Sequence, residues 1–145
     1  MSDERDRMIK ALKEHVVPAL RERGFKGSFP HFRRTTERAI HLVTFQFDKW
    51  GGGFAVEIAA CPPGGVWMPS GEQIPPTKVR AWDVARRLRL GASDEKSDHW
   101  FRYDKRGWSL SSDRFEHAAL RVLPYVKGQA EDWWERESDK QKPSA

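Results

Sequence analysis

The stretch AIHLVTFQFDKWGGGFAVEIAAC, residues 39–61, decides the fold. In its first half Val43, Phe45 and Phe47 alternate with the residues of a second, semi-polar face, and its second half alternates in the same way. A period of two is typical of a β-strand with one face on the core. The segment 48–52 between the halves contains two glycines, which suit a tight turn. The stretch therefore predicts two antiparallel strands joined as a hairpin.

Further strands are expected on both sides of this hairpin. Residues 29–34 are also rich in aromatic and β-branched side chains and lie a short connection away, so with 39–47 and 53–61 they predict an antiparallel meander. Residues 82–90 fit a strand or a helix, and we prefer a short helix or turn followed by a strand over 86–90. Another strand is expected over 99–103.

Helices are predicted at the two ends of the chain. Residues 2–23 carry apolar side chains at spacings of three and four, with a kink expected near Pro18. A cap at 111–113 begins a final helix that buries apolar residues from Phe115 onward, and a frayed tail is expected from Glu135. The fold class is α+β: an antiparallel sheet of four to five strands packed by N-terminal and C-terminal helices. We expect one domain over 1–138 and a disordered tail over 139–145.

The composition bears on where in the cell the protein works and on whether it associates with a membrane. The chain has 145 residues and one cysteine, Cys61, so no internal disulfide can form and a reducing compartment is favoured. Its charged start does not resemble a signal peptide, and no apolar run approaches the length of a membrane helix. We expect a cytoplasmic protein without membrane association. The net charge of +5 is modest, and acidic and basic residues are mixed along the chain.

A long connection follows the third strand. Residues 61–76, CPPGGVWMPSGEQIPP, contain five of the nine prolines and three glycines, so no regular element is expected there. The apolar centre of this connection, Val66-Trp67-Met68, could fold back onto the core or serve a site.

No catalytic or metal motif stands out. His31 and His41 lie on neighbouring predicted strands and could face each other, but a satisfied or exposed histidine is the preferred interpretation. Cys61 lacks a base that would activate it, and the pair Asp98-His99 has no nucleophile in a suitable turn. We therefore predict no catalytic residues, no cofactor, and no stoichiometric zinc, iron or flavin.

Two surfaces are candidates for binding. One is a basic stretch with an interleaved tryptophan, which would suit nucleic acid if the charges were free: Lys78, Arg80, Trp82, Arg86, Arg87 and Arg89. The other is the semi-polar face of the sheet, where a charged floor overhung by a tryptophan would form a pocket for an anionic or peptide ligand. The residues of this second candidate are Arg33, Gln46, Glu57, Trp67, Arg89 and Trp100.

Several short pieces of the sequence resemble a known bacterial family. They are GFK at 24–26, FRR at 32–34, VTFQF at 43–47, FAVE at 54–57, RLRLG at 87–91 and DHW at 98–100. With the opening helix they resemble the family catalogued as domain of unknown function 4304, over about residues 8–108. The resemblance implies a small α+β fold of bacterial origin. It implies no activity and transfers no catalytic residues.

Three classes of function stay open. The first is a non-catalytic binding or interaction module for another protein or an anionic ligand, of which the immunity proteins that block toxins are one example. The second is a nucleic-acid-binding protein that uses the basic stretch. The third is an enzyme whose residues are remote in sequence and converge only in the fold.

Overall fold

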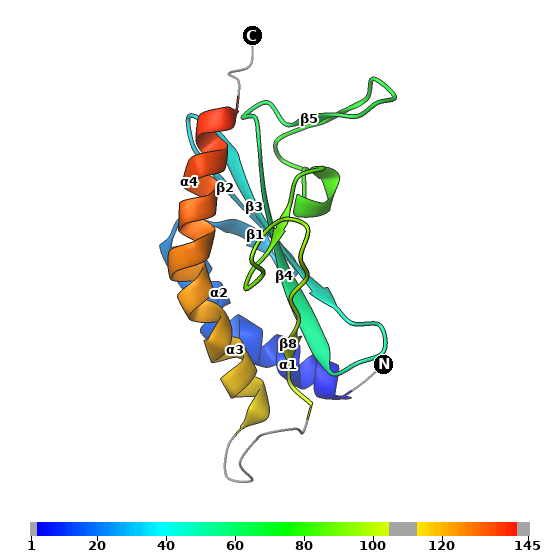
Figure 1. Ribbon diagram of the computed structural model, residues 1–145, viewed down its shortest axis with the longest axis vertical. Coiled ribbons are helices and arrows are strands. Elements are labelled where there is room, and N and C mark those ends of the chain that lie inside the picture. Colours follow the sequence, from blue (N-terminus) through cyan, green and yellow to red (C-terminus); the bar gives the residue numbers. More distant parts are fainter. Residues whose placement is uncertain (1–2, 105–112, 142–145) are drawn as a thin grey trace.

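The computed structural model describes residues 3–104 and 113–141 (Figure 1). The first two residues of the helix cap expected at 111–113 lie outside the described residues. In chain order the elements are α1 (Asp3–His15), α2 (Val17–Glu22), β1 (Lys26–Ser28), β2 (His31–Thr35), β3 (Ile40–Phe47), β4 (Gly53–Cys61), β5 (Val66–Trp67), β6 (Gln73–Ile74), the 3₁₀ helix η1 (Ala81–Asp83), β7 (Leu88–Arg89), β8 (Phe101–Arg102), α3 (Arg114–Tyr125), the π-helical turn η2 (Val126–Ala130) and α4 (Glu131–Lys140).

The main sheet is antiparallel and has the order β1-β2-β3-β4-β7, with β8 paired to another part of β4. The predicted hairpin forms its centre, and β3 pairs with β4 from Ile40↔Cys61 to Phe47↔Phe54. The predicted α+β architecture is confirmed. The sheet has six strands because β1, a three-residue exposed edge strand, adds to those expected. Gly27 in β1 gives no strand signal, since glycine has no side chain to pack.

The α-helices pack on one face of the sheet. The opening helix is broken between α1 and α2, as Pro18 in the first turn of α2 led us to expect. From α3 the chain continues through η2 into α4 as one long helix beside the sheet (Figure 1). The frayed tail expected from Glu135 is wrong, because α4 extends to Lys140 and buries Glu137 and Ser138.

The π-helical turn lies where Pro124 and Gly128 weaken the helix. It aims the side chain of Gln129 at the loop after β7: Gln129 accepts a hydrogen bond from the Gly91 backbone at 2.7 Å and donates one to the Ala92 carbonyl at 2.8 Å. The turn therefore ties this loop to the helix layer.

The larger core lies between the helices and the sheet. Phe45, Val56 and Ile58 point into it, as the alternation of β3 and β4 predicts. The largest side chains that this core encloses completely are Met8, Leu12, Leu20, Phe25, Phe54, Ile58, Leu90, Tyr103 and Trp134.

No helix in the described part of the chain is long and apolar enough to span a membrane.

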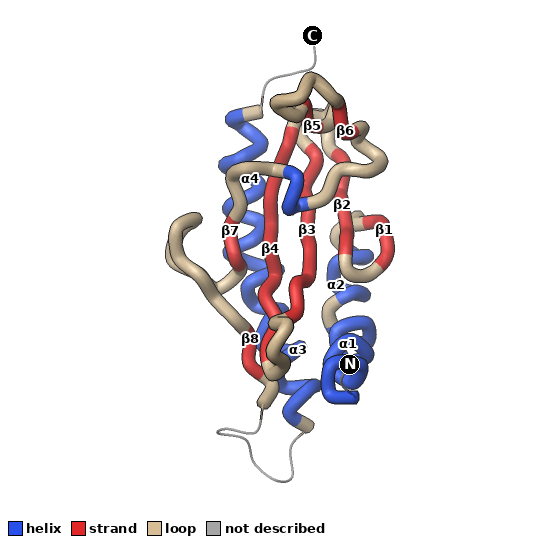
Figure 2. Tube along the Cα trace, turned by 90° about the vertical axis from the view of Figure 1, so that its right-hand side faces the viewer, coloured by secondary structure: helices blue, strands red, loops and turns tan. Residues whose placement is uncertain are grey.

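A smaller core lies on the opposite face of the sheet, which we call the outer face. Its buried members are Ile40, Leu42, Ala59, Cys61, Val79 and Ala81. The segment from β5 to η1 covers them and lies in front of the strands in Figure 2. The expectation of no regular element in 61–76 is wrong, because β5 and β6 pair there as a two-stranded sheet. Strands β7 and β8 lie within the two strands expected over 86–90 and 99–103 and are shorter.

Candidate functional site

Two adjoining pockets open on the outer-face side of the molecule. The larger, of about 760 Å³, lies between the β5–β6 segment, η1 and the end of α4, and we call it the tryptophan pocket. The smaller, of about 360 Å³, lies between β4, β7 and the loop before β8, and we call it the arginine pocket. Residues 85–87 line both. The two pockets therefore share a wall.

Two exposed indole rings border the tryptophan pocket. Trp67 is 69% exposed and Trp82 is 48% exposed, whereas most tryptophan surface in proteins is buried. The ring of Trp82 is held from below by His31, edge to face at 4.6 Å between centroids. The His31 ring is in turn hydrogen-bonded to the Thr44 hydroxyl at 3.0 Å. Trp82 is therefore positioned by the sheet itself.

Trp67 depends on the geometry of the β5–β6 segment. Gly65 has a φ of 98°, and a Cβ atom at this position would collide with the carbonyl of Ile74. The Gln73 side chain donates to the Gly64 carbonyl at 2.7 Å, and the backbone of Met68 donates to Glu72 at 2.8 Å. These contacts close the hairpin so that its apolar centre faces the pocket.

The floor of the arginine pocket follows the register of the sheet. His31, Thr44, Glu57 and Arg89 are aligned across β2, β3, β4 and β7. Arg89 donates from Nε to Glu57 at 3.1 Å, from one Nη to Asp98 at 3.0 Å and from the other to Gln46 at 3.2 Å. Its guanidinium also lies 5.0 Å from the centre of the Trp100 ring. Each nitrogen of Arg89 already has a partner.

The carboxylates around this pocket are engaged as well. Glu57 contacts Arg89 through one oxygen and Arg87 through the other. Asp98 accepts from Arg89 and from the backbone of His99 through one oxygen and from the Trp100 indole through the other.

Three cations at the pocket have donors to spare. Arg87 uses a single Nη, at 3.5 Å from Glu57 and 3.4 Å from the Trp82 carbonyl. Arg86 makes two ion pairs of 3.3 and 3.4 Å, longer than a strong charge-assisted bond. The side-chain ammonium of Lys96 forms no ion pair with a carboxylate in the described ranges 3–104 and 113–141; its backbone N–H donates to Asp94 at 2.9 Å.

The predicted site residues do not all meet. Gln46, Glu57 and Trp100 each contact Arg89. Trp67 lines the neighbouring tryptophan pocket. Arg33 pairs with Leu42, one row further along the sheet, and lines neither pocket; its buried Nε has no hydrogen-bond partner in the described part of the chain.

Sequence analysis missed the contribution of the loop 91–98. This loop brings Glu95, Lys96 and Asp98 to the arginine pocket, and nothing in its short polar sequence signals where it folds. The basic stretch did indicate Arg86 and Arg87. What it could not indicate is that their carboxylate partners come from β4, from this loop and from α4.

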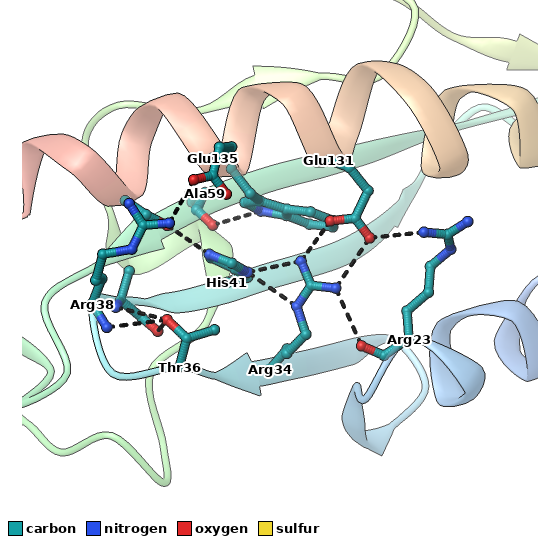
Figure 3. Close-up of polar contacts among 11 residues, drawn as sticks. Arg23, Arg34, Thr36, Arg38, His41, Ala59, Glu131 and Glu135 are labelled. Carbon is teal, nitrogen blue, oxygen red and sulfur yellow. Dashed lines mark hydrogen bonds and ion pairs between the residues drawn. The ribbon is translucent and has the colours of Figure 1, made fainter.

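A second polar cluster lies on the helix side of the sheet (Figure 3). Arg34 on β2 donates to both oxygens of Glu131 on α4, at 2.7 and 3.0 Å, and Arg23 donates to the second oxygen at 3.0 Å. Arg34 also lies 4.7 Å from the ring centre of Phe25. Burial alone would raise the pKa of Glu131, but the hydrogen bonds and charge of Arg34 and Arg23 hold it below its usual value.

His41 completes this cluster. Its Nδ1 accepts from Arg34 at 2.9 and 3.1 Å, so the proton of the neutral ring sits on Nε2, which faces the Ser138 hydroxyl at 2.8 Å. The ring stacks on Trp134 with a 12° angle between planes. Burial, followed by the charge of Arg34, lowers the pKa of His41 to about 4. The cluster joins α4 to the sheet and opens into neither pocket.

The two histidines considered as a ligand pair do not face each other. His31 lies on the outer face beside Trp82, and His41 lies on the helix face beside Trp134. They separate because the pairs His31↔Thr44 and Arg34↔His41 put them on opposite sides of the pleat. Among the described residues, no three His, Cys, Asp or Glu side chains gather as a metal site. Burial raises the pKa of the Cys61 thiol to about 12.

A comparison with known protein families gives a match. The profile of the family described as Domain of unknown function (DUF4304) matches residues 16–136, which is most of the chain. No curated protein and no solved structure gives a match.

Proposed function

The chain belongs to the DUF4304 family, whose description assigns no activity, and from the geometry of its site we propose that it is a non-catalytic module that binds a segment of a partner protein. The tryptophan pocket receives an apolar side chain of that segment. The arginine pocket lies beside it and contacts the flanking residues.

A single observation carries this proposal: an apolar hollow of about 760 Å³ is bordered by two exposed tryptophans. Exposed aromatic surface gathered at a concave site is typical of binding surfaces, because burying it on contact releases water at little cost in side-chain entropy. Tryptophan is also among the residues that dominate the binding energy of interfaces. Trp82 is already held by His31, so its ring needs little ordering on binding.

The chemistry of the titratable groups favours binding over catalysis. Cys61 is the one cysteine of the chain and lines the tryptophan pocket, but a thiol with a pKa of about 12 stays protonated and weakly nucleophilic at neutral pH. His41, with a pKa of about 4, is buried under α4 and holds the helix.

Nucleic acid is the less favoured ligand. Binding to a polyanion draws its energy from cations that neutralise phosphates. Arg86, Arg87 and Arg89 are each already paired with carboxylates of this chain, so bringing phosphates to them would place those carboxylates close to the polyanion. The pairing of these three arginines leaves less unneutralised positive charge for a polyanion than the basic stretch alone indicates.

The proposal places the module in the bacterial cytoplasm. Its single cysteine is buried and free, as suits a reducing compartment. Fractionation of a bacterial host that produces the protein tests this, and recovery of the folded protein outside the cytoplasm would contradict it.

The test of the binding function uses a library of random 12-residue peptides displayed on phage and selected on the immobilised full chain. We expect recovered peptides, made synthetically, to bind the wild type and to lose about 30-fold or more in affinity for Trp67→Ala or Trp82→Ala, the loss typical of a central aromatic anchor. Fluorescence anisotropy of labelled peptides gives the dissociation constants.

Trp50→Ala is the matched control. Trp50 is 85% exposed at the turn between β3 and β4 and lines neither pocket. Its replacement should leave peptide affinity unchanged. The binding function is wrong if no peptide is recovered, or if the Trp67 and Trp82 variants bind as the wild type does. It is also wrong if sedimentation shows that a second copy of the chain fills the pocket.

A further inference from the structure

We propose that the segment bound in the tryptophan pocket carries a carboxylate, and that the arginine pocket selects for it. This inference rests on the proposed function and adds the chemistry of the partner: an acidic peptide segment with a bulky apolar side chain close to an Asp or Glu.

Because the two pockets share a wall, one ligand can contact both of them. Residues 85–87 line the tryptophan pocket on one side and the arginine pocket on the other. An extended chain advances about 3.3 Å per residue, so a few residues suffice to pass from one pocket to the other. An apolar anchor and a charged side chain near it in sequence can therefore be bound together.

The unused hydrogen-bond donors of the arginine pocket belong to positively charged side chains. Both oxygens of Glu57 and of Asp98 already receive donors from this chain. Glu95 likewise faces Arg86 with one oxygen and accepts from the Trp133 indole with the other. The donors left over belong to Arg86, Arg87 and Lys96, so the pocket is built to receive an acceptor of negative charge.

The floor holds one of these cations, Arg87, through Glu57 and does not compete for the ligand. Arg89 is held by Glu57, Asp98 and Gln46 and stacks on Trp100, so it cannot turn toward a ligand without breaking those contacts. Glu57 is nine-tenths buried beneath Arg87 and Arg89. Because Glu57 already holds the guanidinium of Arg87, that side chain loses little conformational entropy when it binds a carboxylate of the ligand.

A single negative charge fits this pocket better than a doubly charged phosphate. Glu57 and Glu95 lie 3.5 and 3.4 Å from the nitrogens of Arg87 and Arg86. A dianion at those arginines would be repelled by both carboxylates, whereas a carboxylate on a flexible side chain can approach Lys96 and the outer nitrogens of Arg87.

The experiment starts from the peptides recovered on the wild-type chain. We expect Asp or Glu to be enriched within a few residues of the apolar anchor. In synthetic peptides, replacing that acid with Asn or Gln should weaken binding about tenfold, as expected for loss of a charge-assisted contact. A phosphoserine at the same position should bind no better than the acid.

Variants of Lys96 identify the pocket that reads the charge. Lys96→Gln should reduce the affinity for the acidic peptide severalfold and leave the affinity for its amide version unchanged. Lys96→Glu should prefer a peptide in which the acid is replaced by Lys. Lys26→Gln, on the exposed edge strand β1, is the matched control and should have no effect.

The outcomes separate the two proposals. If the peptides lose affinity for Trp82→Ala but bind equally with acid or amide, the carboxylate inference is wrong and the binding function stands. A tighter phosphoserine peptide, or equal effects of the Lys96 and Lys26 variants, also overturns the inference. If Trp82→Ala binds every peptide as the wild type does, the binding function itself fails.

Discussion

Two arginines, Arg34 and Arg89, have corresponding roles on opposite faces of the sheet. Each contacts two or more partners that lie far apart in sequence and stacks on aromatic rings: Arg34 on Phe25 and Trp134, Arg89 on Trp100. Arginine suits this task because its planar fork offers five donors and an apolar stacking face. On the helix face the fork fastens α4 to the sheet, and on the outer face it fastens the pocket loop.

The Arg34 contact predicts a measurable loss of stability in Glu131→Gln. The amide cannot accept from Arg34 and Arg23 with the strength of a carboxylate, and it leaves the partly buried Arg34 charge without its counter-ion. We expect the free energy of unfolding in urea to fall by about 1 to 3 kcal/mol.

The control for this change lies one helical turn away. Glu135 lies on the same face of α4, but its side chain is exposed, and it pairs with Arg38, which is also exposed. Glu135→Gln should cost less than about 1 kcal/mol, because exposed ion pairs contribute little. Equal losses in the two variants would show that the Arg34 cluster is not what fastens α4.

At the scale of the elements, the β3–β4 hairpin holds the core together, and its inward residues should tolerate truncation least. Phe45 and Val56 are register partners, and both are buried under the helices. Replacing either with alanine should lower the free energy of unfolding by about 2 to 5 kcal/mol through the cavity left behind.

Urea denaturation measures this effect, with Lys49→Ala at the exposed turn of the same hairpin as the control. An unchanged midpoint for both core variants would contradict the assignment of the inward face. A shifted midpoint for Lys49→Ala would mean that the turn, and not the core, limits stability.

The long elements were predictable from sequence and the short ones were not. The bounds of β4 match the prediction because larger apolar residues and smaller or polar residues alternate between Gly53 and Cys61, as expected when successive side chains point to opposite faces of a strand. Two-residue strands such as β5 and β6 are too short to show such a period. The prolines around them argued against any strand, so the pairing of Val66 with Ile74 was not predicted. Their structure depends on the outer core beneath them, which no local pattern encodes.

The alternation of side chains along the strands predicts which residues of the candidate site share a face, but it does not predict the rest of the site. Alternation placed Gln46, Glu57 and Arg89 on one face, and the structure brings them into contact. It could not show that Arg33 lies one row away, because the register between β2 and β3 depends on the turn that joins them. Nor could it show which loop covers the face, since the contacts of Lys96 and Asp98 join segments far apart in sequence.

For the whole molecule, the sheet separates stability from recognition. The face toward the helices carries the larger core and the Arg34 cluster, and the outer face carries a small core and both pockets. Residues of the outer face can therefore vary with little effect on the larger core. Among the helices that the structure describes, α4 is the one that reaches both regions: its Trp134 lies in the core, while Glu137 and Lys140 line the tryptophan pocket.

The attachment of α4 to the sheet includes His41 and Glu131, so it contributes to how the stability of the whole molecule changes with acid. His41 has a pKa of about 4 in the fold, below its ordinary value of 6.5, so the unfolded chain binds its proton more readily. The stability from the neutral ring is fully present above pH 6.5 and is lost as pH falls toward 4, by up to about 3 kcal/mol. The lowered pKa of Glu131 adds a loss in the same direction at still lower pH.

The measurement is the free energy of unfolding between pH 7 and pH 4 for the wild type and His41→Gln. Glutamine does not titrate, so the variant should be less stable at pH 7 but should show a shallower decline with acid. Parallel curves for the wild type and His41→Gln would mean that proton uptake elsewhere drives acid unfolding, and that the Arg34 cluster does not sense pH in this range.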